Sequence, residues 1–343
     1  MRFRRLMAVS AVAVLLIAAA CGDDDDGDDG AADGGGGEDT GSVNVLNAME
    51  PEEADIVQAV VDETMGDVDY SVEIEASADF EEQYQIRSEG GTLDVALLPQ
   101  PGQVADSVEQ GAISLEDMGF DIGELEDTFG EYLMSLVEVD GQHYGIPTNV
   151  NLKSMIWYPV DAFEEAGYEV PETWDDLLAL SDQIVEDGST PWCVGFESGG
   201  ATGWPATDWM EDIMLRTAGT DVYDQWVTNE IPFDDPAVQN AGELFGEVMF
   251  GEGYVLGGAD QTPSIAFGDA PGPMFQDPPG CWLHRQASFI NAFFPDDAEA
   301  GTDYDWFPFP PIDQEGTLIA GEFAVSFRDA PEIRDFLERF ASE

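Results

Sequence analysis

Basic residues are scarce in this 343-residue chain, which has 10 Lys and Arg against 73 Asp and Glu. Lys153 is the only lysine, and His143 and His284 are the only histidines. A nucleic-acid-binding protein needs a basic face to neutralise phosphates, so this balance excludes nucleic acid as a partner. The net charge of −63 predicts an acidic, soluble surface of the kind that suits a saline environment.

Sequence signatures of catalysis and metal binding are also missing. The chain has no Gly-x-Ser-x-Gly elbow, no His-Glu-x-x-His helix and no phosphate-binding glycine loop that ends in Lys-Ser or Lys-Thr. The Asp run at 23–26 lacks the spacing of an EF-hand. We therefore expect no enzyme, no metal site and no cofactor. Because paired carboxylates can hydrolyse glycosides, a glycoside hydrolase is the alternative from another class.

The longest apolar run, residues 7–20, follows a basic stretch with three arginines. It is too short to span a bilayer and suits the core of a signal peptide. Small residues precede Cys21, so we expect lipoprotein cleavage there, with lipid on the Cys21 thiol; ordinary cleavage after Ala20 is the alternative. Residues 1–20 are thus a predicted signal peptide, and residues 21–41, rich in Asp and Gly, a predicted acidic tether.

Export also determines the expected redox state of the other two cysteines, Cys193 and Cys281. Two cysteines in an oxidising compartment are expected to form a disulfide. The closed loop of about 88 residues would contribute roughly 4 kcal/mol of stability in the chain-entropy model. Two separate buried thiols are the alternative.

Strand and helix patterns alternate in the N-terminal part of the chain. Strands are predicted at 43–48, 71–76 and 93–98, and helices at 51–65, 79–89 and 102–110. This alternation with short connections predicts a parallel sheet with right-handed crossovers. Ligands of such sheets lie beyond the carboxyl ends of the strands.

The composition changes near residue 150. A hairpin pattern covers 137–147, with a type I′ turn at Asp140-Gly141, and an extended stretch follows at 148–158. Thr173 is then expected to cap a helix that ends near residue 186. All eight tryptophans lie between Trp157 and Trp306, which indicates a second lobe.

Several segments resemble the family 1 extracellular solute-binding proteins, the substrate-capture subunits of ABC importers, which include maltose-binding protein. They are Tyr-Gly-Ile-Pro-Thr-Asn-Val-Asn-Leu-Lys-Ser-Met-Ile-Trp-Tyr at 144–158, Phe-Glu-Glu-Ala-Gly at 163–167 and Pro-Glu-Thr-Trp-Asp-Asp-Leu at 171–177. Segments 191–193, 204–209, 267–272 and 279–282 are similar to the α-glucoside-binding branch of that family. The resemblance covers residues 43–343.

The resemblance implies a two-lobed, periplasmic-binding-protein-like α/β fold with ligand in the cleft between the lobes. Each lobe would hold a mostly parallel sheet flanked by helices, and hinge strands would join the lobes. Residues 42–149 with 314–343 would form lobe 1, and residues 150–313 lobe 2. Family members usually continue well beyond this point, so we expect the C-terminal part to be missing.

A sugar site needs aromatic rings for the C–H faces of the sugar and planar polar groups for its hydroxyls. The candidate ligand-binding residues are Glu50, Gln100, Asn151, Glu197, Trp204, Asp208, Trp282, Arg285 and Glu322. Trp282 is a candidate because the resemblance places it at the position of a sugar-stacking tryptophan. A structural role beside the disulfide is the alternative for Trp282.

Structural alternatives exist for the other tryptophans as well. Trp204 and Trp209 are five residues apart on one predicted helix, so they do not share a face. We expect Trp204 in the cleft and Trp209 in the core. Trp174 and Trp226 are also expected to be core residues.

The charged candidates have alternatives of their own. Asp208 can be a solvated helix acid, and Glu50 can favour the N-terminus of the helix that follows it. Arg285 can pair with a neighbouring acid, and an ion pair is our first interpretation of Lys153.

These observations lead to one hypothesis: a lipid-anchored receptor that captures a neutral oligosaccharide, an α-glucoside, by closure of two lobes. It would act as a monomer on the extracytoplasmic face of the cell membrane and deliver its ligand to the transmembrane subunits of an ABC permease. The alternatives are another neutral ligand such as a polyol, the glycoside hydrolase, and a sensory receptor that feeds a kinase.

Overall fold

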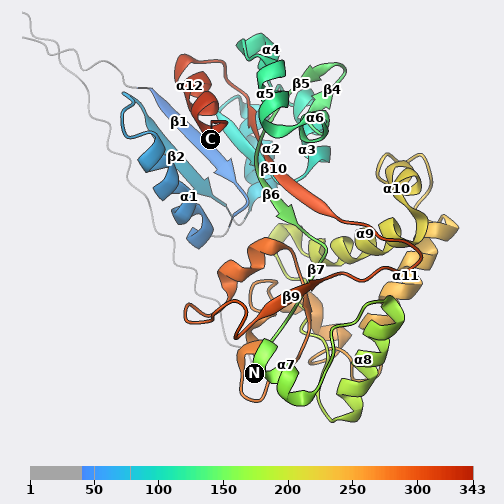
Figure 1. Ribbon diagram of the computed structural model, residues 1–343. Coiled ribbons are helices and arrows are strands. Elements are labelled where there is room, and N and C mark those ends of the chain that lie inside the picture. Colours follow the sequence, from blue (N-terminus) through green and yellow to red (C-terminus); the bar gives the residue numbers. More distant parts are fainter. Residues whose placement is uncertain (1–40, 50, 78, 343) are drawn as a thin grey trace, which may run out of the picture. The chain divides into compact units, whose positions relative to one another are not determined.

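The computed structural model describes residues 41–49, 51–77 and 79–342 (Figure 1). The predicted signal peptide, Cys21 and Glu50 therefore lie outside the described residues. So does the predicted tether, apart from Gly41.

The first sheet has five strands in the order β2-β1-β3-β10-β6. They are β1 (Ser42–Asn47), β2 (Ser71–Ala76), β3 (Val95–Leu98), β6 (Ile146–Leu152) and β10 (Ile319–Ser326). β1 pairs in parallel with β2 and β3, as the alternating pattern predicts. β10 is antiparallel to both β3 and β6, because it re-enters this sheet from the other end after the excursion through the second lobe.

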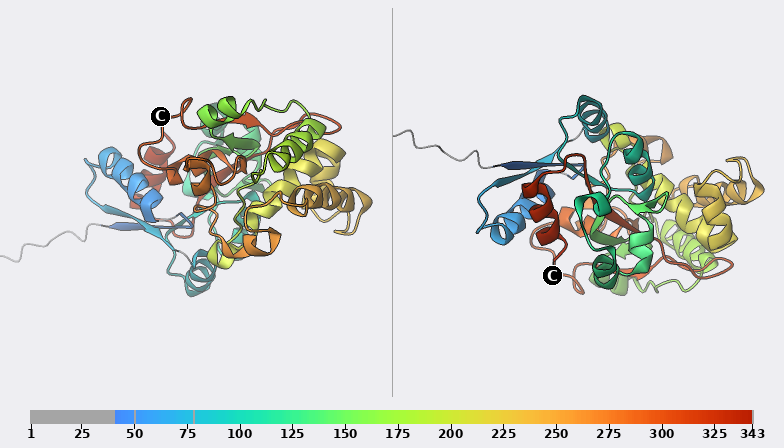
Figure 2. Two further views of the ribbon diagram at one scale, coloured as in Figure 1. Left: turned by 90° about the horizontal axis from the view of Figure 1, so that it is seen from below. Right: turned by 90° about the horizontal axis from the view of Figure 1, so that it is seen from above.

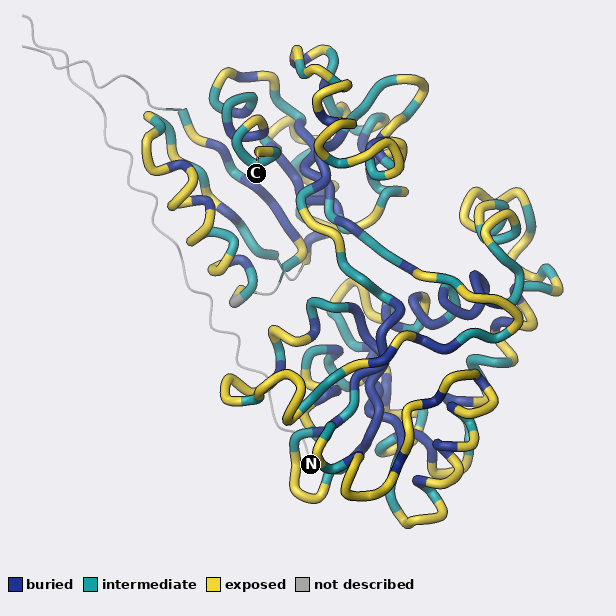
Figure 3. Tube along the Cα trace, in the orientation of Figure 1, coloured by how far each residue is buried: buried dark blue, intermediate teal, exposed yellow. Residues whose placement is uncertain are grey.

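Helices surround this sheet and complete what we call the first lobe. They are α1 (Pro51–Thr64), α2 (Phe80–Gly90), α3 (Pro101–Glu109), α4 (Leu115–Met118), α5 (Ile122–Phe129), α6 (Glu131–Ser135) and α12 (Pro331–Phe340). The apolar strands are buried, whereas the outward faces of the helices are exposed (Figure 3). The C-terminal helix α12 packs against β1 (Figure 2).

A small hairpin, β4 (Glu138–Val139) and β5 (Gln142–His143), precedes β6. Its turn residues Asp140 and Gly141 both have positive φ, 52° and 83°. A type I′ turn requires this at both central positions, so the prediction for this turn is confirmed.

The second lobe contains a three-stranded sheet in the order β8-β7-β9. Its strands are β7 (Met155–Tyr158), β8 (His284–Arg285) and β9 (Asp305–Pro308). Around it lie α7 (Val160–Ala166), α8 (Trp174–Glu186), α9 (Trp204–Ala218), α10 (Thr220–Val227), α11 (Pro236–Met249) and the 3₁₀ turns η1 (Gly199–Ala201), η2 (Ala259–Ser264), η3 (Gly272–Phe275) and η4 (Ser288–Phe293). Thr173 caps α8 by accepting a hydrogen bond from the Asp176 amide, as predicted.

The second lobe differs from the expectation in strand direction. Both pairings of its named sheet are antiparallel. Parallel pairing occurs in this lobe as isolated β-bridges, such as the one between Trp192 and Val255. Residues 192–196 pass close to a neighbouring segment, since a Cβ at Gly195 would lie 2.7 Å from the Ile265 carbonyl oxygen.

Two crossings join the sheets, one from β6 to β7 and one from β9 to β10. β6, where the chain leaves the first sheet, and β10, where it returns, pair with each other (Figure 1). Beyond the pairing, the Lys153 amide donates to the Leu318 carbonyl over 2.9 Å. The two crossing segments are therefore held together at the point where they enter the second lobe.

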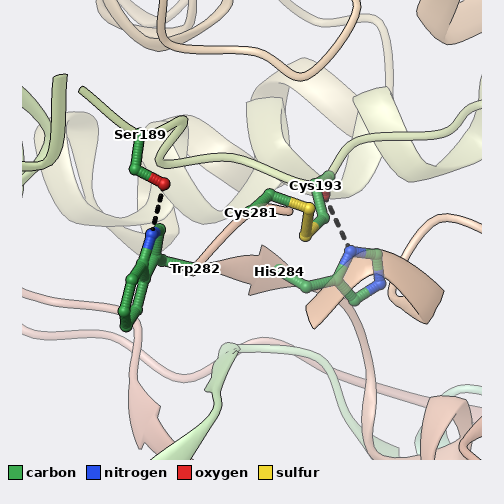
Figure 4. The surroundings of a disulfide bond; sticks show 5 residues. All are labelled: Ser189, Cys193, Cys281, Trp282 and His284. Carbon is green, nitrogen blue, oxygen red and sulfur yellow. Dashed lines mark hydrogen bonds between the residues drawn. A yellow bond between two sulfur atoms is a disulfide. The ribbon is translucent and has the colours of Figure 1, made fainter. Parts of the chain in front are cut away.

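Cys193 and Cys281 form the predicted disulfide, with Cα atoms 5.4 Å apart (Figure 4). Both cysteines are buried. The His284 ring lies beside the bridge and its Nδ1 is 2.9 Å from the Cys193 carbonyl oxygen. Burial lowers the pKa of His284 to about 4, so this imidazole is neutral at pH 7.

Candidate functional site

One face of β6 carries two asparagines, Asn149 and Asn151, from the first sheet toward the second lobe. Residues two apart on a strand point to the same side, so we call this pair the β6 polar face. The Asn149 amide nitrogen donates to Glu322 Oε2 over 2.9 Å. Asn151 Oδ1 accepts from the Ser288 hydroxyl over 3.2 Å. The β6 polar face therefore links β10 of the first lobe to η4 of the second.

Glu322 and Gln100 lie at one edge of the first sheet. Phe323 of β10 pairs with Leu98, the last residue of β3, so Glu322 lies at the carboxyl end of β3. Gln100 is exposed and directly precedes α3. Both polar groups thus lie near the edge where sheets with parallel strands hold their ligands. Glu50, the third candidate here, is outside the described residues.

The Glu322 carboxyl group is perturbed by its surroundings. Its burial and, second, the negative charge of Glu53 in α1 raise its pKa to about 7, while the hydrogen bond from Asn149 works in the opposite direction. Near neutral pH this carboxyl is therefore both a hydrogen-bond donor and an acceptor. Hydroxyl ligands require both kinds of partner.

The raised pKa predicts a pH-dependent effect of the substitution Glu322→Gln. The folded chain holds this proton more tightly than the unfolded chain, whose pKa is ordinary. The stability contribution of Glu322 is therefore full below the unfolded pKa and is lost as the pH rises through about 7. We expect E322Q to melt above the parent protein at pH 8, by about 1 kcal/mol of unfolding free energy after allowance for its partial exposure, and close to it at pH 5.

Thermal melts at several pH values check this expectation. The exposed Glu230→Gln is the control for removal of one negative charge from an acidic chain. An E322Q advantage that is the same at pH 5 and pH 8 would show that charge removal, and not the pKa of Glu322, causes it.

Three rings form an aromatic platform in the second lobe: Trp204, Phe267 and Phe289. Trp204 begins α9 and is half-buried. Its ring centroid lies 5.3 Å from that of Phe267 and 5.9 Å from that of Phe289. Because Phe289 follows Ser288 in η4, the platform adjoins the β6 polar face. An aromatic surface beside amide and carboxyl groups suits a ligand with C–H faces and hydroxyls.

Trp209 and Trp174 lie in the core, as predicted. Trp209 is 1% exposed and packs against Trp192, with ring centroids 5.1 Å apart. Trp174 is buried at the start of α8. Trp226 is half-buried on α10 and packs against the same core.

Asp208, Arg285 and Lys153 belong to an ion cluster, together with Asp212 and Arg216. Lys153 Nζ lies 2.8 Å from Asp208 Oδ1, and Arg285 Nη1 lies 3.2 Å from Asp208 Oδ2. Arg285 also pairs with Asp212, which accepts from Arg216 Nη1 over 2.6 Å. The ion-pair alternative thus holds for Arg285 and Lys153. Asp208 is buried and is not a solvated helix acid.

Trp282 and Glu197 are engaged within the second lobe. Trp282 is 8% exposed, packs edge-on against Tyr168 and donates from Nε1 to the Ser189 hydroxyl over 2.7 Å (Figure 4). These contacts favour the structural role that the sequence left open. Glu197 is half-buried and accepts from the Gly199 amide over 2.9 Å, which shapes the loop before α9.

Sequence reasoning missed Asn149 and Phe289. Asn149 has a signal in the sequence, because it alternates with Asn151 along a predicted extended segment. Phe289 has none, since only the folded chain brings η4 against β6.

Two surface cavities of the second lobe share no lining residue with the aromatic platform or the β6 polar face. One, of about 280 Å³, is lined by Asp161, Phe275 and Asp303, and the other, of about 420 Å³, by Asp182, Phe250 and Tyr254, among others. Within the described ranges, no group of three His, Cys, Asp or Glu side chains could hold a metal ion. No helix formed by the described residues has the length and hydropathy of a membrane-spanning segment.

Comparison with known families decides what kind of protein carries this site. The family described as bacterial extracellular solute-binding protein matches residues 50–338. The chain belongs to this family. Membership makes it an extracytoplasmic binding protein and not an enzyme, so the hydrolase alternative is excluded.

Two relatives of this solute-binding protein cover most of its length. The osmoprotective compounds-binding protein GgtB of Synechocystis is 39% identical over 309 residues, which are 89% of this chain and 73% of GgtB. The alpha-glucosides-binding periplasmic protein AglE of Rhizobium meliloti is 43% identical over 277 residues, 77% of this chain. The match spans only 60% of AglE.

Solved structures agree on the fold. The bacterial solute receptor AcbH, which prefers β-D-galactopyranose, has a TM-score of 0.73 at 20% identity, with 88% of this chain and 76% of AcbH covered. A chitin oligosaccharide binding protein has a TM-score of 0.72 at 17% identity, with the same coverage. The predicted two-lobed α/β architecture of this solute-binding protein is therefore confirmed.

Proposed function

We propose that this solute-binding protein captures a neutral oligosaccharide, with an α-glucoside as the first candidate, and delivers it to an ABC permease. The observation that carries the proposal is the half-buried Trp204 platform beside the β6 polar face. The ligand would contact both lobes, so it would bind a closed arrangement best and shift the population toward it.

The relatives support this substrate class. AglE is named for α-glucosides and GgtB for osmoprotective compounds. The second candidate ligand is another neutral compound, a polyol or a different sugar, and the osmoprotective compounds in the name of GgtB are consistent with it. Gln100, Asn151, Glu197 and Glu322 are the proposed hydroxyl partners that the structure describes, and Glu50 is proposed from its sequence position alone.

We also propose that Cys21 carries a lipid that holds the mature chain at the extracytoplasmic face of the membrane. The signal-peptide pattern and the small residues before Cys21 support this, as does the acidic segment that follows. The proposal also places the lobe boundaries near residues 150 and 313. It further holds that the protein is a monomer.

Ligand-induced stabilisation tests the sugar assignment. A ligand present at 100 times its dissociation constant stabilises a protein by about 2.7 kcal/mol, which raises the melting temperature by several degrees. We expect maltose or trehalose to do this, and Trp204→Ala to weaken binding in isothermal titration at least about ten-fold, because stacking and apolar burial are both lost.

Trp306→Ala is the matched control, since Trp306 is 40% exposed on β9, outside the platform. We expect it to bind as the parent protein does. A melting temperature that rises with amino acids or peptides and not with sugars or polyols would contradict the proposal.

A further inference from the structure

Lys153 occupies the junction of the two crossing segments. It lies between β6 and β7, and its amide donates to Leu318 on the segment that returns to β10. The next residue, Ser154, accepts from the Leu318 amide over 2.7 Å and donates to Asp212 on α9 over 2.6 Å. The backbone around Lys153 is thus fixed to both crossings and to α9.

The Lys153 side chain connects this junction to the aromatic platform. Its ammonium group contacts Asp208 over 2.8 Å and lies 5.3 Å from the centroid of the Trp204 ring. Trp204 and Asp208 are four residues apart on α9, so they share one face of the helix. A cation within about 6 Å of an indole is attracted by the electrons of the ring.

Neutralisation of the Asp208 charge does not by itself explain why a lysine occupies position 153. Asp208 Oδ2 already faces Arg285 Nη1 at 3.2 Å, and Arg285 also donates to the Asp208 carbonyl over 2.9 Å. The Lys153 side chain is 15% exposed, so its ammonium group is partly desolvated. A cation in that state interacts more strongly with an aromatic ring than one in water.

Trp204 therefore has neighbours on several sides. Phe267 and Phe289 contact its ring, and the Lys153 ammonium lies over it. Trp204 as a residue is still half-buried and not fully covered, so part of its surface is available to a ligand.

We propose that Lys153 is a positioning residue of the sugar site, which holds the Trp204 ring in its stacking orientation and links it to the hinge. This role rests on the proposed function. Lys153 itself does not need to touch the ligand. Movement at the crossings would carry the ammonium group with it, so ring orientation and hinge geometry would change together.

A double-mutant cycle on ligand affinity tests this role. The variants are Lys153→Met, Trp204→Ala and the pair together, each titrated with maltose or trehalose by calorimetry. We expect K153M to weaken binding about ten-fold in the parent background and by less than about two-fold in the W204A background, because the ring it positions is then absent. Lys153→Arg keeps a cation and should remain within about three-fold of the parent protein.

The other results separate the possible failures. If the parent protein binds the sugar and K153M lowers the melting temperature without changing affinity, Lys153 is structural only and the inference is wrong. Equal losses in both backgrounds would also overturn it. If K153M does not fold, Lys153→Gln, which keeps a donor for Asp208 without the charge, takes its place in the cycle. If the parent protein binds neither sugars nor polyols, the proposed function itself fails, and this inference fails with it.

Discussion

Replacement of Asp212 by Asn is expected to lower the free energy of unfolding by about 3–5 kcal/mol, since it leaves two buried arginines without their shared carboxylate. Asp212 and Arg285 are buried almost completely. The Asp212 carboxylate accepts from Arg216 and from Ser154, each over 2.6 Å, and pairs with Arg285. For a chain of this size the loss corresponds to a fall in melting temperature on the order of 10 °C.

The exposed Asp224→Asn on α10 is the matched control, with the same chemical change on a helix of the same lobe. Because the chain carries a net charge of −63, removal of an exposed acid should leave stability unchanged or slightly higher. Equal melting temperatures for D212N and D224N would show that the ion cluster contributes little to the fold.

Loss of the disulfide should have an effect of similar size. The bridge joins residues 88 apart, so its removal returns roughly 4 kcal/mol of chain entropy to the unfolded state. The double substitution Cys193→Ala and Cys281→Ala avoids leaving polar atoms at two buried positions. We expect its melting temperature to fall by about 10 °C.

Reductant distinguishes the bridge from the packing of its atoms. Dithiothreitol should lower the melting temperature of the parent protein toward that of the double variant and leave the double variant unchanged. A parent protein that melts at one temperature with and without reductant would rule out a stabilising bridge.

Local patterns were sufficient to predict several helix ends and one turn. Pro51 begins α1 and Thr173 caps α8 as the sequence predicts, because helix ends depend on residues within one turn. The turn at Asp140-Gly141 is equally local. The antiparallel direction of β10 was not predictable in this way, because it depends on the path of the chain through the second lobe.

Some residues of the candidate site could likewise be predicted from the sequence, and others could not. Asn151 and Trp204 could be proposed from residue chemistry and position. Phe289 could not, because its proximity to Trp204 arises from contacts between segments about 85 residues apart. Charge type suggested that Arg285 and Lys153 would pair with acids, but nothing in the sequence indicated Asp212 as the carboxylate shared by two arginines.

The sequence by itself determined the acidic composition of the chain, the order of its first strands and helices and its family resemblance, and it predicted the pairing of Cys193 with Cys281 that the structure shows. These properties depend on composition, on short-range periodicity or on a small number of possible partners. Only the tertiary structure decided that Trp282 packs in the core, that Asp208 is buried in an ion cluster and that Lys153 lies over Trp204. Burial and ion pairing depend on which sequence-distant segments come into contact in the fold. The residue pattern of a single segment does not specify those contacts.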